Sequence, residues 1–123
     1  MKKNLFTTII AIFMATAVWA QPVQIGTSDV YWEINGTTLE ITGSGDMPDF
    51  NSGEAPWYSY QASLNSLTMA DAITHIGDWA FYNFSNLTTV TMPASLVSIG
   101  VAAFLNCSGL TGNIHIPAEV TSI

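Results

Sequence analysis

The sequence predicts a β-rich solenoid of stacked repeats, with short helical turns and an N-terminal β-hairpin that caps its first edge. The main observation is a repeat: residues 64–86 align with 87–109 without a gap over 23 residues, and nine positions are identical. The second is Asn35-Gly36, which lies between two runs of alternating apolar and polar residues, as in a two-residue hairpin loop. A unit of this size cannot bury an apolar face alone, so neighbouring units are expected to stack around one continuous core.

Each repeat begins with a leucine-rich pattern. Residues 64–69 and 87–92 have the orders Leu-x-x-Leu-x-Met and Leu-x-x-Val-x-Met. Apolar residues that alternate in this way are typical of a strand with one buried face, and the spacing is that of a leucine-rich repeat. Pro93 follows the second pattern and is expected to end its strand, because proline cannot donate to a sheet ladder.

The remainder of each unit is expected to form a second extended piece and a short turn. Ile99-Gly100 closes the extended piece, and Ala103-Phe104 is expected to form one helical turn that places the ring in the core. Cys107 falls in the same column as Phe84, so this lone cysteine is expected to be a buried apolar residue. A partial third unit, 110–123, follows with one inserted residue, which moves the period to 24.

The hairpin separates an apolar side from a polar side. With Asn35-Gly36 as the loop, the expected pairs on the apolar side are Ile34 with Thr37, Trp32 with Leu39 and Val30 with Ile41. The other side carries Tyr31, Glu33, Thr38 and Glu40. The open end of a solenoid exposes apolar core and strand edges, so the apolar side is expected to cap it.

The two glutamates of the polar side raise the question of catalysis. Glu33 and Glu40 are expected to lie diagonally across the hairpin, about 7–8 Å apart, which is within the range of carboxylate pairs in inverting glycosidases. An exposed sheet side offers no cleft that would raise one of the two pKa values. The sequence therefore predicts no enzyme, no catalytic residue and no cofactor.

The first twenty residues are predicted to be a secretory signal peptide. Lys2 and Lys3 precede an apolar run at 5–17, and Val18-Trp19-Ala20 offers small residues at the −3 and −1 positions of a cleavage site. The run is short for a membrane span of about 20 residues, so no membrane insertion is expected after cleavage. The chain from residue 21 onward has no Lys or Arg and carries all nine acids. Nucleic-acid binding depends on such cations and is not expected.

The segment 45–60 contains acids and aromatic rings at close spacing. Asp46, Asp49 and Glu54 suggest oxygen ligands, but the order of residues does not fit a calcium-binding loop, which needs a glycine at position 6 and a glutamate at position 12. No metal site is assigned, and weak calcium binding stays open. The segment is expected to be the joint between cap and repeats, with Met47, Phe50, Trp57 and Tyr58 packed inside it. His75 and His115 are expected to be surface residues rather than ligands.

The repeats resemble the BspA-type leucine-rich repeats of bacterial surface proteins, whose pattern is roughly C-x-x-L-x-x-[VI]-x-[IL]-P-x-x-[VL]-x-x-I-G-x-x-A-F. The matching residues are Leu87, Val90, Met92, Pro93, Leu96, Ile99, Gly100, Ala103 and Phe104, and Cys107 begins the next match. Phe84 stands where the family has Cys, and Ala70 replaces the strand-ending Pro. The resemblance implies a secreted or surface-displayed recognition protein associated with adhesion, and it transfers no catalytic residue.

The expected organisation has three parts: a signal peptide at 1–20, a hairpin cap and joint at 21–63, and leucine-rich repeats at 64–123 (64–86, 87–109 and a partial unit at 110–123). A solenoid presents the outward residues of its strands as one surface. The expected partner-binding face therefore consists of Ser66, Thr68, Thr89, Thr91, Asn113 and His115. A threonine ladder that only favours strands would have the same composition.

The predicted function is recognition or adhesion, in which the face binds a host or bacterial protein or a glycan at the cell surface. Two alternatives stay open: a structural stalk or spacer that displays another domain, and an accessory region of a larger secreted hydrolase. Solenoids usually need at least three repeats, so the chain is expected to be a fragment of a longer protein.

Overall fold

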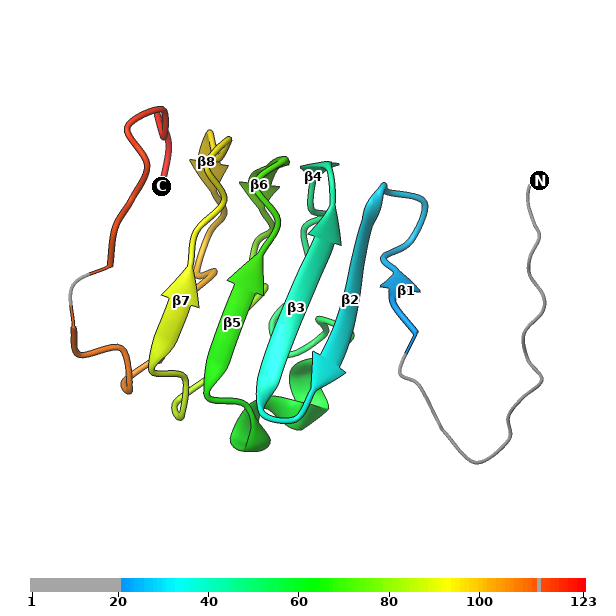
Figure 1. The fold of residues 1–123 in the computed structure, drawn as a ribbon. Helices are drawn as coiled ribbons and strands as arrows, with labels where there is room; N and C mark the ends of the chain where they lie inside the picture. The colour runs from blue at the N-terminus through cyan, green and yellow to red at the C-terminus, as the bar shows by residue number, and fades with distance from the viewer. Residues whose placement is uncertain (1–20, 113) are drawn as a thin grey trace, which may run out of the picture.

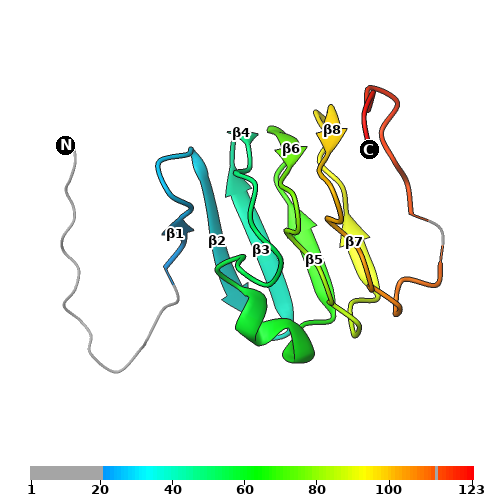
Figure 2. The same cartoon turned by 180° about the vertical axis from the view of Figure 1, so that it is seen from behind.

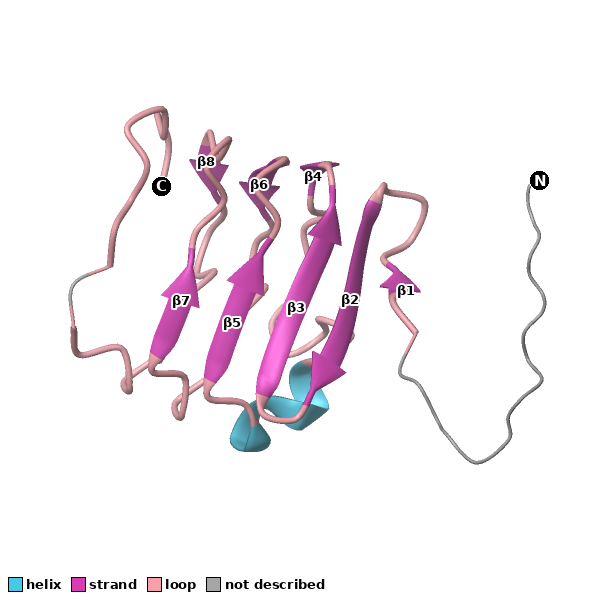
Figure 3. Cartoon of the chain, in the orientation of Figure 1, coloured by secondary structure: helices cyan, strands magenta, loops and turns pink. Residues whose placement is uncertain are grey.

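The chain forms two sheets joined by turns, in a computed structural model that describes residues 21–112 and 114–123. The five-stranded sheet has the order β1-β2-β3-β5-β7 and the three-stranded sheet the order β4-β6-β8. The strands of the first sheet are β1 Val23–Gln24, β2 Val30–Asn35, β3 Thr38–Gly43, β5 Ser66–Met69 and β7 Thr89–Thr91, and those of the second are β4 Gly45–Asp46, β6 Ile73–Ile76 and β8 Ser98–Ile99. A 3-10 helix, η2, spans Tyr58–Ser63 (Figures 1 and 3). The predicted signal peptide at 1–20 and Asn113 lie outside the described residues.

Successive turns of the chain lie one on another with the period that the sequence repeat predicts. In the parallel pair β5–β7, Leu67 is opposite Val90, and in the parallel pair β6–β8, Ile76 is opposite Ile99. Each partner is 23 residues along the chain, so each repeat supplies one strand to each sheet, as the views from both sides show (Figures 1 and 2). The strands β3 and β4 form an earlier turn of the same kind, parallel to β5 and β6.

The hairpin at β2–β3 exists, but its predicted register is wrong. Asn35 pairs with Thr38 and Ile34 with Leu39, so the loop is Gly36-Thr37 rather than Asn35-Gly36. Gly36 has a φ of 62°, a conformation that glycine adopts without strain. The loop lies one residue later than predicted, so each residue of β2 pairs with a residue of β3 two positions further along. Because this change in pairing is an even number of residues, every side chain keeps its predicted side of the sheet; a change of one residue would have reversed the sides.

The predicted helical turn at Ala103-Phe104 is a non-helical turn in the structure. Within this turn only alternate amides donate locally, such as Ala103 to the Gly100 carbonyl at 3.3 Å and Leu105 to the Ala102 carbonyl at 3.2 Å. In the equivalent turn of the preceding repeat, the amides in between donate to the next repeat: Trp79 to the Val101 carbonyl at 2.9 Å and Phe81 to the Ala103 carbonyl at 2.8 Å. An α-helix would instead use every amide of the segment for bonds within it. Trp79 and Ala102, at equivalent positions, both have positive φ values, of 59° and 55°.

The third unit continues the stack but contains less β-structure than the two complete repeats. The Ser98–Ser122 bridge joins it to β8 at a spacing of 24 residues, which confirms the predicted insertion. Within the described part of this unit, the bridge is its only β-structure. Ile123 is 81% exposed, so the last apolar position is open to solvent. Among the described residues, none forms a helix long and apolar enough to cross a membrane.

The core lies between the two sheets and includes the predicted apolar column. Its largest fully buried side chains are Trp57, Phe81, Phe84, Leu39, Ile41, Met47, Leu64, Leu67, Ile73, Ile76, Leu87 and Leu96. Trp57 is at the centre of the aromatic part: it stacks on Phe81 at 5.6 Å and meets Phe50 and Trp32 edge-on. Its indole N–H donates to the Ala80 carbonyl at 2.7 Å. The expectation that Met47 and Trp57 are packed inside is confirmed, whereas Phe50 and Tyr58 are half-buried.

We expect Trp57→Ala to destabilise the protein, because it removes three ring–ring contacts and leaves the Ala80 carbonyl without its donor. The loss in the free energy of unfolding should be about 3–5 kcal/mol, measured by urea denaturation. Tyr60→Ala is the matched control, since that ring is 48% exposed. Equal stability of the two variants would contradict this account of the core.

Candidate functional site

The outward face of the five-stranded sheet brings together four of the six residues predicted to bind a partner. Ser66 is opposite Thr89, and Thr68 is opposite Thr91. Thr68, Thr89 and Thr91 are exposed, and Ser66 is half-buried. Their positions follow from strand alternation, since Leu67 between them points into the core.

The other two predicted residues do not extend this sheet in the structure. His115 is exposed but lies in no strand, because the third unit contributes none among its described residues. Asn113 lies outside the described residues. The face observed on the repeats is therefore narrower than predicted.

On its opposite edge the same face is wider than predicted, because the hairpin continues it. Thr38 is opposite Ser66 and Glu40 is opposite Thr68, through the parallel pair β3–β5. Across β2, β3, β5 and β7 this makes two rows: Asn35, Thr38, Ser66 and Thr89, and Glu33, Glu40, Thr68 and Thr91. We call these eight residues the sheet face. Sequence reasoning missed its hairpin half because β3 was assigned to a cap and not to the repeat sheet.

The two glutamates of the sheet face are closer than predicted. Glu33 and Glu40 are direct partners in the β2–β3 ladder, not diagonal neighbours, because the loop is one residue later. Both are half-buried. Directly opposed like charges destabilise a sheet. Tyr31 precedes Glu33 by two residues on the same strand, so its ring lies on the same side.

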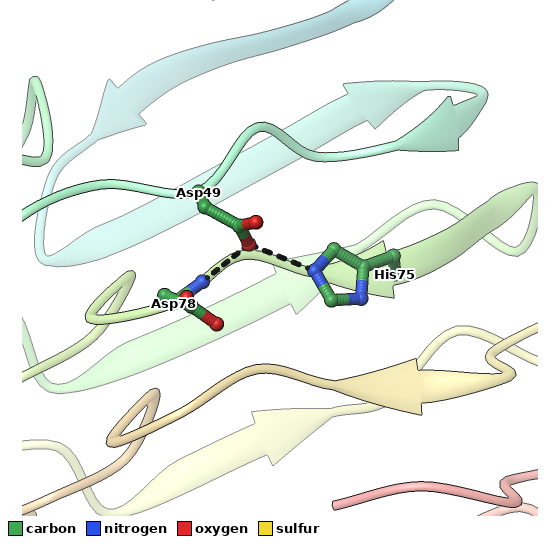
Figure 4. A group of neighbouring side chains, drawn as sticks. All are labelled: Asp49, His75 and Asp78. Carbon is green, nitrogen blue, oxygen red and sulfur yellow. Dashed lines mark hydrogen bonds and ion pairs between the residues drawn. The ribbon is translucent and has the colours of Figure 1, made fainter.

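A second cluster of polar side chains joins three successive turns at the three-stranded sheet. Figure 4 shows its members Asp49, His75 and Asp78, which lie on two of these turns. The Asp49 carboxylate oxygen Oδ1 accepts hydrogen bonds from His75 Nε2 at 2.9 Å and from the Asp78 backbone amide at 2.8 Å. The other ring nitrogen of His75, Nδ1, is 2.6 Å from the Ser98 hydroxyl. His75 is half-buried, and Ser98 lies under it at the 23-residue spacing. The gapless alignment of the two repeats places Ser98 at the position equivalent to His75, but it does not predict the contact of His75 with Asp49.

The Asp49–His75–Ser98 group has the residue types of a nucleophile, a base and an orienting acid. Such a group also needs room for a substrate and donors for the developing oxyanion. A cavity of about 590 Å³ lies elsewhere, between the second repeat and the third unit. Its lining is apolar and includes Met92, Phe104, Leu110, Ile114 and Ile123. The hydrogen bonds of this group link successive turns of the chain, and we describe it as a structural cluster.

The same region contains three groups that could offer ligands to a metal ion. One ligand atom each of Asp49, His75 and Asp78 lies within 4.8 Å of the others. Both carboxylates already accept backbone bonds of one kind: Asp49 from the Asp78 amide, and Asp78 from the Val101 amide at 2.7 Å. The same carboxylate-to-amide bond thus occurs in two successive turns, and a structural role in linking the turns explains both carboxylates.

The acids of 45–60 do not converge as the calcium hypothesis requires. Asp46 accepts a bond from the Thr74 hydroxyl at 2.7 Å, and Glu54 from the Asn51 amide at 3.0 Å. Asp49 is engaged by His75. Each of the three acids has a separate partner.

Cys107 is half-buried and its thiol is 3.1 Å from the Phe81 carbonyl oxygen. Burial raises the pKa of this thiol, which reduces the thiolate that a nucleophile would need. The prediction of an unreactive residue in the Phe84 column fits this position, although burial is less complete than expected.

Asp49 gives the stability of the fold a pH dependence. The His75 hydrogen bond, followed by the Asp78 amide, holds the pKa of Asp49 below its ordinary value of 3.8. A carboxyl group with a lowered pKa stabilises the fold fully above the unfolded value and loses that effect as pH falls through the folded value. We expect the melting temperature of Asp49→Asn to fall less than that of the wild type below about pH 4.

The matched control for this experiment is Glu54→Gln, which removes an exposed carboxylate bonded only within its own loop. Thermal unfolding followed by circular dichroism between about pH 6 and pH 2.5 covers the window. If Asp49→Asn and Glu54→Gln give the same slope as the wild type, the Asp49 link contributes nothing to stability.

Comparison with known proteins gives one family and a set of solved structures. The family model described as BspA type leucine rich repeat region (6 copies) matches residues 55–123. A leucine-rich repeat protein from Eubacterium ventriosum has a similar structure, with a TM-score of 0.66 and 26% identity over 72% of this chain and 24% of that one. A leucine rich cell surface protein from Faecalibacterium prausnitzii aligns with a TM-score of 0.42 and 25% identity, over 89% of this chain and 31% of that one. No curated protein matches the chain.

Proposed function

The chain belongs to the BspA type leucine rich repeat family, and we propose that it is an exported protein that recognises a protein or a glycan through its sheet face. The fold is that of leucine-rich repeats, since both the family model and the E. ventriosum structure agree with the parallel stacking. The chain spans 24% of the length of that solved structure, so the role of a whole protein is part of the proposal.

The observation that carries the proposal is the sheet face itself. Its residues come from four strands in continuous register, and those on the repeats are short, polar and uncharged. The part of the sheet face on the repeats can follow a partner over its length without the desolvation penalty of unpaired buried charges. Repeat proteins use such extended strand surfaces for binding.

The proposed organisation keeps the three parts predicted from sequence: 1–20 as signal peptide, 21–63 as hairpin cap and joint, and 64–123 as repeats of a solenoid. The antiparallel pair β1–β2 supports the capping role, because it ends the parallel sheet at the N-terminal edge. The predicted signal peptide and the resemblance of the repeats support the proposal of export and display at the cell surface. Adhesion is the biological role that we propose for this surface.

The test is binding of the full chain to a panel of extracellular matrix proteins and glycans, measured by surface plasmon resonance. Thr68→Gln/Thr91→Gln places two longer neutral side chains on the sheet face at exposed positions. We expect this variant to weaken binding about tenfold, which corresponds to about 1.4 kcal/mol, with an unchanged melting temperature.

The control is Ser59→Gln/Ser63→Gln, which makes the same kind of change at two exposed positions of η2. It should leave binding unchanged. If nothing in the panel binds, or if both variants weaken binding equally, the proposal fails and a stalk or spacer becomes the better description.

A further inference from the structure

We propose that Asn35 is the attachment site of an N-linked glycan, which a transferase outside the cytoplasm adds from a lipid-diphosphate-linked oligosaccharide. The modification goes beyond the proposed recognition role and rests only on the proposed export of the chain, because N-linked glycans occur on surface loops of exported proteins. The acceptor tripeptide is Asn-x-Ser/Thr with a middle residue other than proline. The sequence contains it at four places: 35–37, 83–85, 86–88 and 106–108.

Burial of the middle residue separates these four tripeptides. In two of them it is a core side chain: Phe84 is 1% exposed and Leu87 is 0% exposed. In 106–108 it is Cys107, which is half-buried with its thiol near the Phe81 carbonyl oxygen. A transferase must hold the acceptor amide and the hydroxyl two residues later at the same time. In these three tripeptides it would have to pull the residue between them away from the core.

The fold also uses the asparagines of the same three tripeptides. The side-chain amide of Asn83 donates to the Tyr58 hydroxyl at 3.2 Å, that of Asn86 to the Ala62 carbonyl at 2.8 Å, and that of Asn106 to the Asn83 side-chain oxygen at 3.2 Å. Each bond joins successive turns of the chain. Asn83 and Asn106 also have positive φ values, of 69° and 64°, which asparagine tolerates better than most residues. The structure therefore explains asparagine at all three positions.

Asn35 has neither of these structural roles. It is the last residue of β2, where it pairs with Thr38, and it is not among the described residues with a positive φ. Its side-chain amide donates to the Glu33 carboxylate at 3.1 Å, an exposed bond within one strand that links no turns. The positive φ of the loop falls on Gly36, so the turn does not require asparagine before it. Since asparagine is also disfavoured in strands, the fold leaves the identity of residue 35 unexplained.

The tripeptide 35–37 is open over its whole length at the tip of the β2–β3 hairpin. Asn35, Gly36 and Thr37 are all exposed, and nothing lies within 4 Å of the position that a Cβ on Gly36 would occupy. In Figure 1 this tip is at the end of the five-stranded sheet, where β2 turns into β3. A glycan at Asn35 therefore extends into solvent and displaces no residue of the core.

Attachment at Asn35 is a substitution at the anomeric carbon of the first sugar. The Nδ2 atom of the side chain forms a bond to C1 of the sugar, the bond from C1 to the diphosphate oxygen breaks, and the lipid diphosphate leaves with the electron pair. One of the two amide protons goes to a base of the transferase. The substituted amide keeps its other N–H, so the bond to Glu33 can persist.

The first measurement uses the chain as it is recovered from outside the cells that produce it. From residue 21 onward there is no Lys or Arg, so cleavage after glutamate replaces trypsin. It places the proposed site in the peptide 34–40 and the other three tripeptides in the peptide 55–119. Mass spectrometry should find the peptide 34–40 heavier by the mass of an oligosaccharide and the peptide 55–119 at its unmodified mass.

The second measurement incubates the purified, folded chain with a solubilised bacterial oligosaccharyltransferase and its lipid-diphosphate-linked oligosaccharide. The wild type should gain one glycan. Thr37→Ser should still gain it, because the hydroxyl remains, and Thr37→Val should gain none.

Two asparagine variants separate attachment from stability in the same assay. Asn35→Gln should gain no glycan and should melt like the wild type, because residue 35 is exposed. Asn86→Gln is the matched control: it should gain the glycan but melt at a lower temperature, because it disturbs the bond to the Ala62 carbonyl.

An unmodified peptide 34–40 in the chain from outside the cell would overturn the inference and leave the proposed export intact. A glycan on the peptide 55–119, a folded wild type that gains none, or a Thr37→Val variant that still gains one would also overturn it. A chain found only inside the cell would refute the proposed export, and the inference with it. Binding through the sheet face is measured separately and depends on none of these results.

Discussion

The close approach of successive backbones at the Ile-Gly positions is the constraint on which the rest of this structure depends. A Cβ at Gly77 would collide with the Pro48 carbonyl oxygen, and one at Gly100 would be 2.5 Å from the Asp78 nitrogen and 2.8 Å from the Gly77 carbonyl carbon. No real Cβ tolerates such contacts with backbone. The turns can therefore lie at sheet spacing only if each repeat has glycine there.

This spacing has consequences on both sides of the core. At the glycine itself, the Asp78 carboxylate reaches the Val101 amide of the next turn, as Asp49 reaches the Asp78 amide. On the other side, the same 23-residue offset aligns Thr68 with Thr91 and so creates the level rows of the sheet face. Between them, Leu67, Ile76 and Phe81 meet equivalent residues of the next repeat in the core. One backbone contact thus sets the links between turns, the packing and the candidate binding surface.

The repeat part of the fold was predictable because the residues that form the core and the close backbone contacts recur at a fixed spacing in the sequence. Leu64 and Leu87, or Gly77 and Gly100, stand at identical positions, and a gapless alignment is enough to place one above the other. The hairpin register was not predictable in this way. Loops at Asn35-Gly36 and at Gly36-Thr37 both keep alternation intact, and the parallel pairing of β3 with β5 comes from residues far along the chain.

In the candidate site, too, the part that lies on the repeats was predictable from the sequence, and the part that lies outside them was not. Ser66, Thr68, Thr89 and Thr91 follow from alternation within a repeat. The opposed pair Glu33–Glu40 depends on the hairpin register, and the contact of Asp49 with His75 involves a segment that the gapless sequence repeat does not cover. Sequence periodicity carries no information about such contacts.

The most direct measurement is the thermal unfolding of Gly77→Ala and Gly100→Ala against Gly112→Ala, followed by circular dichroism. A Cβ at Gly112 meets nothing within 4 Å. The account predicts that each of the first two variants loses about 1–3 kcal/mol or more in the free energy of unfolding, while Gly112→Ala stays close to the wild type. Wild-type stability in Gly77→Ala and Gly100→Ala would contradict the claim that this backbone contact sets the spacing of the turns.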